Sequence, residues 1–216
     1  MLLRLTQTHT AMENRFQAAA TLVENAAVII FLCLAGCTTP SQQLESPSEL
    51  RIGQPQEEVR KIFGAPKRSE TGSNGRTLDV FVTLLPKMES SDSRLKVFEV
   101  RSMHVLYNEQ GKVVNFSHYA GELKGFTKLN KEWQAGPWLA PEKVTAIQRG
   151  TTSRDALLRV FGPATIQGLN VYGDPVMSWM FMEGGKTTGT IRGRELLVLF
   201  NANLTVRDYL LRDFQP

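Results

Sequence analysis

The chain has 216 residues and a formal net charge of +4, and 21% of its residues are charged. This mildly basic balance lacks the clustered positive charge typical of nucleic-acid binding, so we expect no nucleic-acid partner. Its two cysteines, Cys33 and Cys37, both precede the expected folded body. That excludes a disulfide, a cysteine metal site and a thiol nucleophile from the body.

An apolar run at residues 26–35 leads directly into Leu34-Ala35-Gly36-Cys37 and then into polar Thr38. Such a run is typical of a secretory signal, and it is shorter than the roughly 20 apolar residues that span a bilayer. The four residues resemble the bacterial lipobox, in which the cysteine is lipidated and begins the mature chain. We therefore predict a signal peptide at residues 1–36 and a lipid on Cys37. The alternative is an uncleaved apolar anchor with an incidental cysteine.

Residues 37–49 are polar, and they include Pro40 and Pro47. This composition predicts a flexible tether between the lipid and the folded body.

Two later segments, residues 51–66 and 148–163, look alike. Each has a glycine, a polar turn, a short amphipathic helix, a Phe-Gly pair and a proline. The motif residues are Gly53, Val59, Phe63, Gly64 and Pro66 in the first copy, and Gly150, Thr152, Leu157, Phe161, Gly162 and Pro163 in the second.

The spacing and residue types of these motifs predict which side chains are buried and where each helix begins and ends. Helical spacing predicts that Val59 and Phe63, and likewise Leu157 and Phe161, are buried. Gly64 and Gly162 stand where a helix ends with a positive φ, and the prolines forbid continuation. Pro55 suits a first helical position, and Thr152 with Asp155 fits a capping box.

Strands are predicted after each helix, at residues 78–84 and 101–106 in the first copy and at 176–182 and 196–200 in the second. Residues 105–113 match residues 198–206 without a gap, and each stretch reads as a strand, a turn and a second strand. Alternation places Ser102 and His104 on a polar, solvated face. A short helix is also predicted at residues 141–148, with Val144 and Ile147 facing inward.

Residues 121–139 are predicted to link the two copies, at 50–120 and 140–216. They carry Phe126, Trp133 and Trp138, which we expect to pack against one or both copies. The alternative is that these aromatic residues form the centre of a partner-binding surface.

The repeated motifs resemble the SmpA/OmlA (BamE-like) family of bacterial outer-membrane lipoproteins, over about residues 46–119 and 140–216. The resemblance implies an α+β fold of two tandem ααβββ modules, with short helices packed on one face of an antiparallel sheet. The face without helices would then be the natural contact surface for a partner. A tandem of such modules is also similar to a secreted β-lactamase-inhibitor protein.

The resemblance further implies a place at the periplasmic face of the outer membrane, because Thr38 is not the aspartate that retains such lipoproteins in the inner membrane. We expect a non-enzymatic interaction or structural module, in outer-membrane protein assembly or envelope integrity, with another envelope protein as partner. The alternative is a proteinaceous enzyme inhibitor, and a small hydrolase using Ser117 or Ser178 is a third class. No residues suggest a cofactor or a metal.

Overall fold

The computed structural model describes residues 49–87, 95–127, 132–185 and 191–214. The predicted signal peptide, Cys37 and nearly all of the predicted tether lie outside the described residues. The described helices are α2 (Gln56–Phe63), α3 (Pro141–Thr145) and α4 (Arg154–Phe161). The strands are β1 (Arg68–Thr71), β2 (Thr77–Lys87), β3 (Leu95–Tyr107), β4 (Val113–Thr127), β5 (Glu132–Ala135), β6 (Ile166–Leu169), β7 (Pro175–Gly185), β8 (Ile191–Phe200) and β9 (Val206–Phe214).

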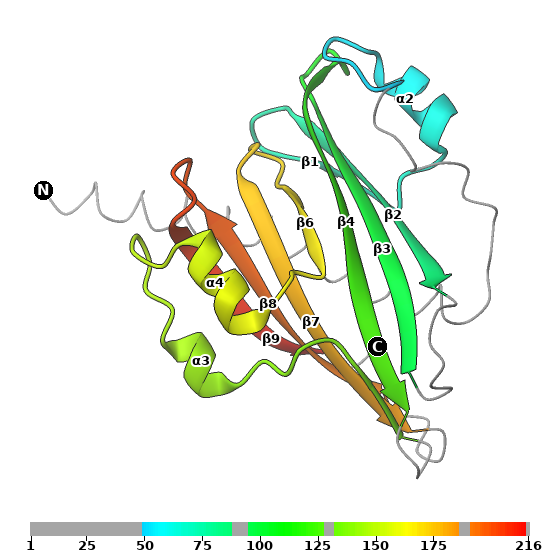
Figure 1. Cartoon of the computed structure of the whole chain (residues 1–216). Helices are drawn as coiled ribbons and strands as arrows, with labels where there is room; N and C mark the ends of the chain where they lie inside the picture. The colour runs from blue at the N-terminus through cyan, green and yellow to red at the C-terminus, as the bar shows by residue number, and fades with distance from the viewer. Residues whose placement is uncertain (1–48, 88–94, 128–131, 186–190, 215–216) are drawn as a thin grey trace, which may run out of the picture.

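The nine strands of the described residues belong to one antiparallel sheet in the order β1-β2-β3-β4-β5-β7-β8-β9, with β6 paired to β7 off this path. The sheet curls into a half-barrel, with α2 near one side and α3 and α4 near the other (Figure 1). The α+β prediction of two helix-covered modules is therefore wrong. The described chain is mainly antiparallel β-structure, and its three helices are only five to eight residues long.

The predicted linker explains much of this difference. Residues 121–127 continue β4, and β5 follows within the same segment. β5 pairs with β4 on one side and with β7 on the other. Backbone hydrogen bonds therefore run without interruption from the first half (residues 50–120) into the second half (residues 140–216).

The face predicted to be free for a partner is occupied by the protein itself. A central core joins apolar side chains from both halves, among them Val80 and Val100 from the first and Met180 and Leu197 from the second. At about 25 cal/mol per Å² of apolar surface removed from water, this burial strongly favours keeping the halves together. The predicted contact surface is thus the interior of the curl.

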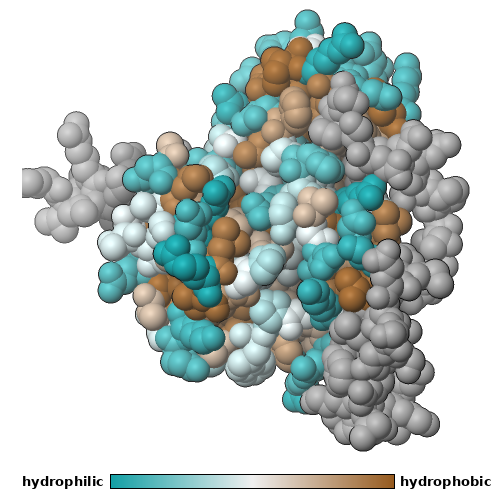
Figure 2. Space-filling view, in the orientation of Figure 1, coloured by the Kyte–Doolittle hydropathy of each residue, from teal (hydrophilic) through white to brown (hydrophobic). Residues whose placement is uncertain are grey.

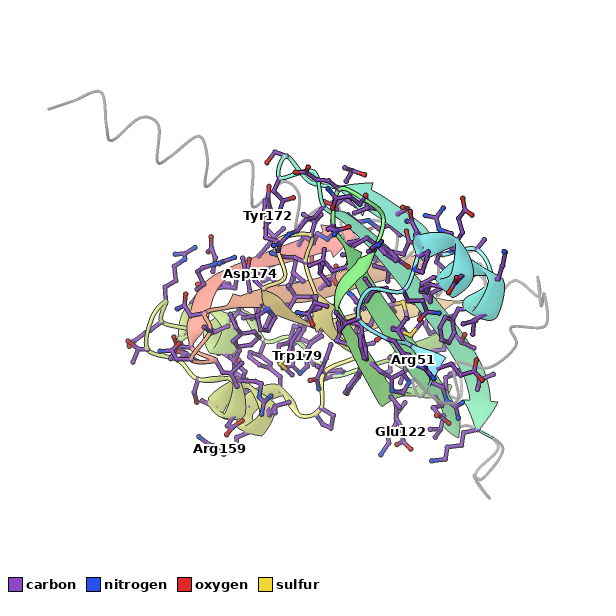
Figure 3. All side chains as sticks on the ribbon, turned by 90° about the horizontal axis from the view of Figure 1, so that it is seen from above. Arg51, Glu122, Arg159, Tyr172, Asp174 and Trp179 are labelled. Carbon is purple, nitrogen blue, oxygen red and sulfur yellow. The ribbon has the colours of Figure 1, made fainter. Side chains whose placement is uncertain are left out.

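Two smaller cores involve the helices. Val59 of α2 packs with residues of β2, β3 and β4, including Phe81 and Met103. Leu157 and Phe161 of α4 pack with residues of β7 and β8, including Trp179. On the face shown in Figure 2, hydrophobic residues are interspersed with hydrophilic ones, and Figure 3 places Trp179 inside the molecule.

The backbone of the two halves repeats in detail. The Gly53 N–H donates to the Val113 carbonyl at 2.8 Å, and the Gly150 N–H donates to the Val206 carbonyl at 2.7 Å. Each half also has a bulge where its last hairpin begins, beside Tyr107 in one and beside Phe200 in the other.

Candidate interaction surface

The predicted motif residues hold the turns and helices of each half. Gly64 and Gly162 have φ values of 79° and 76°, and Gly53 and Gly150 have 84° and 76°, so all four adopt the positive φ that glycine tolerates. These values confirm the positive φ predicted at Gly64 and Gly162. Pro66 and Pro163 follow the two helix ends, as the sequence requires.

The helix predictions hold in part. Val59, Leu157 and Phe161 are buried as predicted, whereas Phe63 is only half-buried and packs against its core from the side. The capping prediction was wrong, because Ser153 is the N-cap of α4 and its hydroxyl accepts from the Ala156 N–H at 3.2 Å. Thr152 instead accepts from the Gln148 N–H, which closes the preceding turn.

His104 is the clearest correction among the polar residues, because it is 1% exposed rather than solvated. Its Nδ1 lies 2.9 Å from the Leu169 carbonyl of β6, and burial lowers the pKa of His104 to about 4. The imidazole is therefore neutral and holds the edge of β6 against β3. The predicted alternation of side chains between the two faces of β3 is confirmed. The face that carries His104 is covered by β6, whose Leu169 lies 65 residues further along the chain.

The hydrolase alternative receives no support from these contacts. Ser117 lies opposite His104 across β3 and β4, but neither its hydroxyl nor the His104 Nε2 has a hydrogen-bond partner among the described residues. Ser178 donates to the Glu195 carboxyl at 2.5 Å, inside the sheet. A serine nucleophile needs a base within hydrogen-bond reach and access for a substrate, and neither serine combines the two.

Burial raises the pKa of Glu195 to about 7, although the hydrogen bond from Ser178 and the charge of Arg212 lower it. The Arg212 Nε donates to the same carboxyl at 3.1 Å. The Ser178–Glu195–Arg212 group links β7, β8 and β9, and its geometry is that of a structural ion pair.

A groove on the second half is the strongest candidate for contact with a partner. Its volume is about 320 Å³, and its lining combines aromatic and paired charged side chains: Trp138, Phe181, Glu183, Arg192, Gly193, Arg194 and Asp213. Concave sites with an aromatic lining and a few placed polar groups are typical binding sites.

The local sequence places Trp138 over this groove. Gly136 follows β5 with a φ of 82°, and a Cβ on it would lie 1.8 Å from the Met180 carbonyl. Only glycine allows the chain to cross β7 so closely. Trp138 then packs edge-on against Phe181, with ring centroids 5.0 Å apart, yet it remains 58% exposed.

Charged side chains fix the rim of the groove. Arg194 lies 5.6 Å from the centre of the Trp138 ring and donates from Nε to Asp213 at 2.6 Å. This hydrogen bond holds the pKa of the Asp213 carboxyl below its usual range. A packed but largely exposed tryptophan beside an ion-paired arginine is the composition typical of a binding hot spot.

The sequence alone points to only one member of this groove. It predicts that Trp138 packs or binds a partner, and Trp138 packs against Phe181 while staying largely exposed. Arg194 and Asp213 lie 56 and 75 residues further on and carry no motif. Only the pairing of β8 with β9 brings them together.

No helix among the described residues is long and apolar enough to cross a membrane. Within the described ranges, no three His, Cys, Asp or Glu side chains come together in a group that could hold a metal ion.

In comparisons with known proteins, no family model, curated protein or solved structure matches the chain. Membership of the SmpA/OmlA family therefore remains a prediction from the motifs.

Proposed function

We propose that this protein is a lipid-anchored interaction module at the periplasmic face of the bacterial outer membrane. The observation that carries the proposal is the apolar run ending in Leu34-Ala35-Gly36-Cys37. Several acyl chains on Cys37 would give stable membrane attachment, whereas a single chain binds only marginally. Residues 38–49 would then tether the folded body, which begins at Leu50.

Features of the described body support binding to a partner as its task. Two of the buried polar residues, His104 through Nδ1 and Glu195 through its carboxyl, bond to the protein's own strands, and the side that curls inward is filled by the central core. The groove at Trp138 offers an exposed aromatic residue and an arginine that is ion-paired with Asp213. We assign contact with another envelope protein to this groove.

Metabolic labelling with radioactive palmitate tests the anchor. We expect the full chain to take up the label and to fractionate with the outer membrane, and Cys37→Ser to lose both properties. Cys33→Ser is the matched control and should behave like the wild type. A wild-type chain without label, or a labelled Cys37→Ser chain, would contradict the proposal.

The sorting residue gives a second test of the anchor. Thr38→Asp should leave palmitate labelling unchanged but move the protein to the inner-membrane fraction. Thr38→Ser is the conservative control and should stay with the outer membrane. Outer-membrane location of Thr38→Asp would refute the proposed sorting rule for this chain.

Site-specific photocrosslinking in cells tests the groove. A photoreactive residue at Glu183, which lines the groove, should give a discrete adduct. The same residue at Val160, which is exposed on α4 and does not line the groove, should not. Trp138→Ala should reduce the Glu183 adduct several-fold without changing the circular dichroism spectrum. Equal adducts from both positions would remove the groove from the proposal.

The second candidate is an enzyme inhibitor, and the exposed Trp138 is the observation that favours it, since inhibitors bury such anchors in a target cleft. The identity of the adduct separates the two functions. A hydrolase in the Glu183 adduct supports inhibition, whereas a component of the envelope machinery supports the interaction module.

A further inference from the structure

The two edges of the sheet differ in how they are protected against pairing with another strand. At one edge β1 is only four residues long, and the part of β2 beyond it carries Pro86 and Lys87. Short strands, proline and lysine are the usual devices that block an edge. At the other edge β9 has nine residues and contains no proline, glycine or lysine.

The open part of the β9 edge begins at Arg207. Just before it, the Val206 N–H donates to the Thr152 carbonyl and the Val206 carbonyl accepts from Gly150, so this end is already covered. Among the described residues, no strand pairs with the far side of β9. Residues 207–212 are all half-buried, whereas residues 195–200 of the neighbouring β8 are all buried.

Charges on β9 provide little of the usual protection, because each already has a partner within its own chain. An arriving strand would therefore not leave a bare charge buried, which is the costly case. The ion pairs are Arg207 with Asp174 at 2.7 Å, Asp208 with Arg149 at 2.7 Å, Arg212 with Glu195 at 3.1 Å and Asp213 with Arg194 at 2.6 Å. Asp174 lies at the β6–β7 turn, beside Tyr172 in Figure 3.

The open edge reads Arg-Asp-Tyr-Leu-Leu-Arg-Asp from residue 207 to residue 213. When two copies of this segment run antiparallel and are centred on the same residue, each arginine lies opposite an aspartate. We propose that β9 pairs antiparallel with β9 of a second copy of this chain, about a two-fold axis at Leu210. Arg207 then lies opposite Asp213 of the second copy, and Asp208 lies opposite its Arg212. Opposite charges directly across a strand pair stabilise it.

The charge pattern selects this register over its neighbours. A shift by one residue places Asp208 opposite Asp213 of the second copy, and like charges directly opposite are destabilising. A shift by two residues in the same direction places Leu210 opposite Arg212 of the second copy, and the pairs of opposite charge are lost. The two-fold arrangement uses the same surface on both copies, as closed dimers do, and continues the sheet from one copy into the other.

A cysteine at the two-fold axis tests the proposal in the full chain. Directly opposite residues in an antiparallel pair have Cα atoms roughly 4.5–5.5 Å apart, which is within disulfide range. Leu210→Cys should therefore give a disulfide-linked dimer on a non-reducing gel. The wild type and Asn203→Cys, in the exposed β8–β9 turn, are the controls and should run as monomers. Absence of the Leu210→Cys dimer would overturn the proposal.

Charge reversal in the Leu210→Cys background tests the register. Asp213→Arg sets two arginines opposite each other and should reduce the yield of dimer several-fold. The swap Arg207→Asp with Asp213→Arg restores opposite pairs and should recover the yield, although it breaks two ion pairs within the chain. Recovery supports the register, and loss in the swap at an unchanged circular dichroism spectrum contradicts it.

Discussion

The two halves place different side chains at the same contact between helix and strand. In each half the glycine that ends the helix donates its N–H back into the helix, Gly64 to the Arg60 carbonyl and Gly162 to the Leu158 carbonyl, both at 2.9 Å. Arg60 and Leu158 are therefore equivalent positions. By the same comparison of backbone hydrogen bonds, Asp79 of β2 is equivalent to Met177 of β7.

The first half fills these positions with an ion pair. Arg60 donates from Nε and from Nη2 to the Asp79 carboxyl, both at 2.8 Å, and Gln56 adds a hydrogen bond at 3.1 Å. Asp79 is fully buried, while the Arg60 side chain is 40% exposed. The second half fills the same positions with Leu158 and Met177, which are apolar and pack in its core.

One backbone therefore accepts either a satisfied ion pair or an apolar pair at these two positions, provided that both members change together. A buried pair is a weak source of stability, but removing one member leaves a costly uncompensated charge. The aromatic pair beside it is kept in both halves, as Phe63 with Phe81 at 5.9 Å and Phe161 with Trp179 at 5.8 Å.

Breaking the aromatic pair of the second half should destabilise the fold more than any other substitution considered below. Phe161→Ala should lower the free energy of unfolding by about 4 kcal/mol, because this side chain is 5% exposed and leaves a cavity. Phe63→Ala should cost about 2 kcal/mol, since Phe63 is half-buried. Urea denaturation measures both values. A cost below about 1 kcal/mol at Phe161 contradicts the assigned core.

Exchange of the ion pair tests the equivalence directly. Arg60→Leu should cost about 3 kcal/mol, because Asp79 then stays buried without its cation. Arg60→Leu combined with Asp79→Met, the pair of the second half, should return the stability to within about 1 kcal/mol of the wild type. A double variant no more stable than Arg60→Leu would show that the two positions are not interchangeable.

Each half also contributes a buried titratable residue to the shared interior, and the two residues change the stability of the fold with pH in opposite directions. His104 of the first half has a lowered pKa of about 4, so the folded state loses stability as pH falls from the unfolded value near 6.5. Glu195 of the second half has a raised pKa of about 7, so the folded state gains stability as pH falls from 7 toward 4.5. The two effects should nearly cancel.

Glu195→Gln separates these titrations by removing one of them. The variant should lose about 3 kcal/mol of stability on acidification from pH 7 to pH 4, while the wild type changes by about 1 kcal/mol. Glu57→Gln, at an exposed carboxyl of α2, is the control and should follow the wild type. Parallel pH profiles for Glu195→Gln and the wild type, from chemical denaturation, would contradict the burial of this carboxyl.

The smallest effect concerns a turn. Leu204 has a φ of 60° where the first half has Gly111 with a φ of 68°. A side chain in this region costs about 1 kcal/mol, so Leu204→Gly should raise the free energy of unfolding by up to about 1 kcal/mol. Leu204→Ala removes the side chain but keeps the strain, and it should not be stabilising. Equal stabilities for the two variants would argue against strain at this turn.

Local features of the fold could be predicted because their causes lie within a few residues. The glycines after each helix, the burial of Val59 and Leu157, and the hairpins at residues 105–113 and 198–206 follow from spacing and turn chemistry. The helix starts were less accurate. Pro55 is the N-cap of α2 rather than its first helical residue, and Ser153 rather than Thr152 caps α4.

The arrangement of the halves could not be predicted in the same way. Residues 121–139 look like a linker because glycine and lysine are frequent there, but pairing of β5 with β7 depends on a strand more than 40 residues away. His104 looks solvated because nothing nearby shows that β6 will cover it. The Trp138 groove depends on the same long-range pairing, so only its tryptophan could be recognised in advance.

We infer that β5 joins the two halves into one cooperative sheet. Native-state hydrogen exchange, measured peptide by peptide in rising denaturant, tests it most directly. We expect the amides of β3 in the first half and of β8 in the second to merge into one global opening with the same free energy. Exchange of one half at a clearly lower free energy, while the other stays protected, would contradict a single sheet.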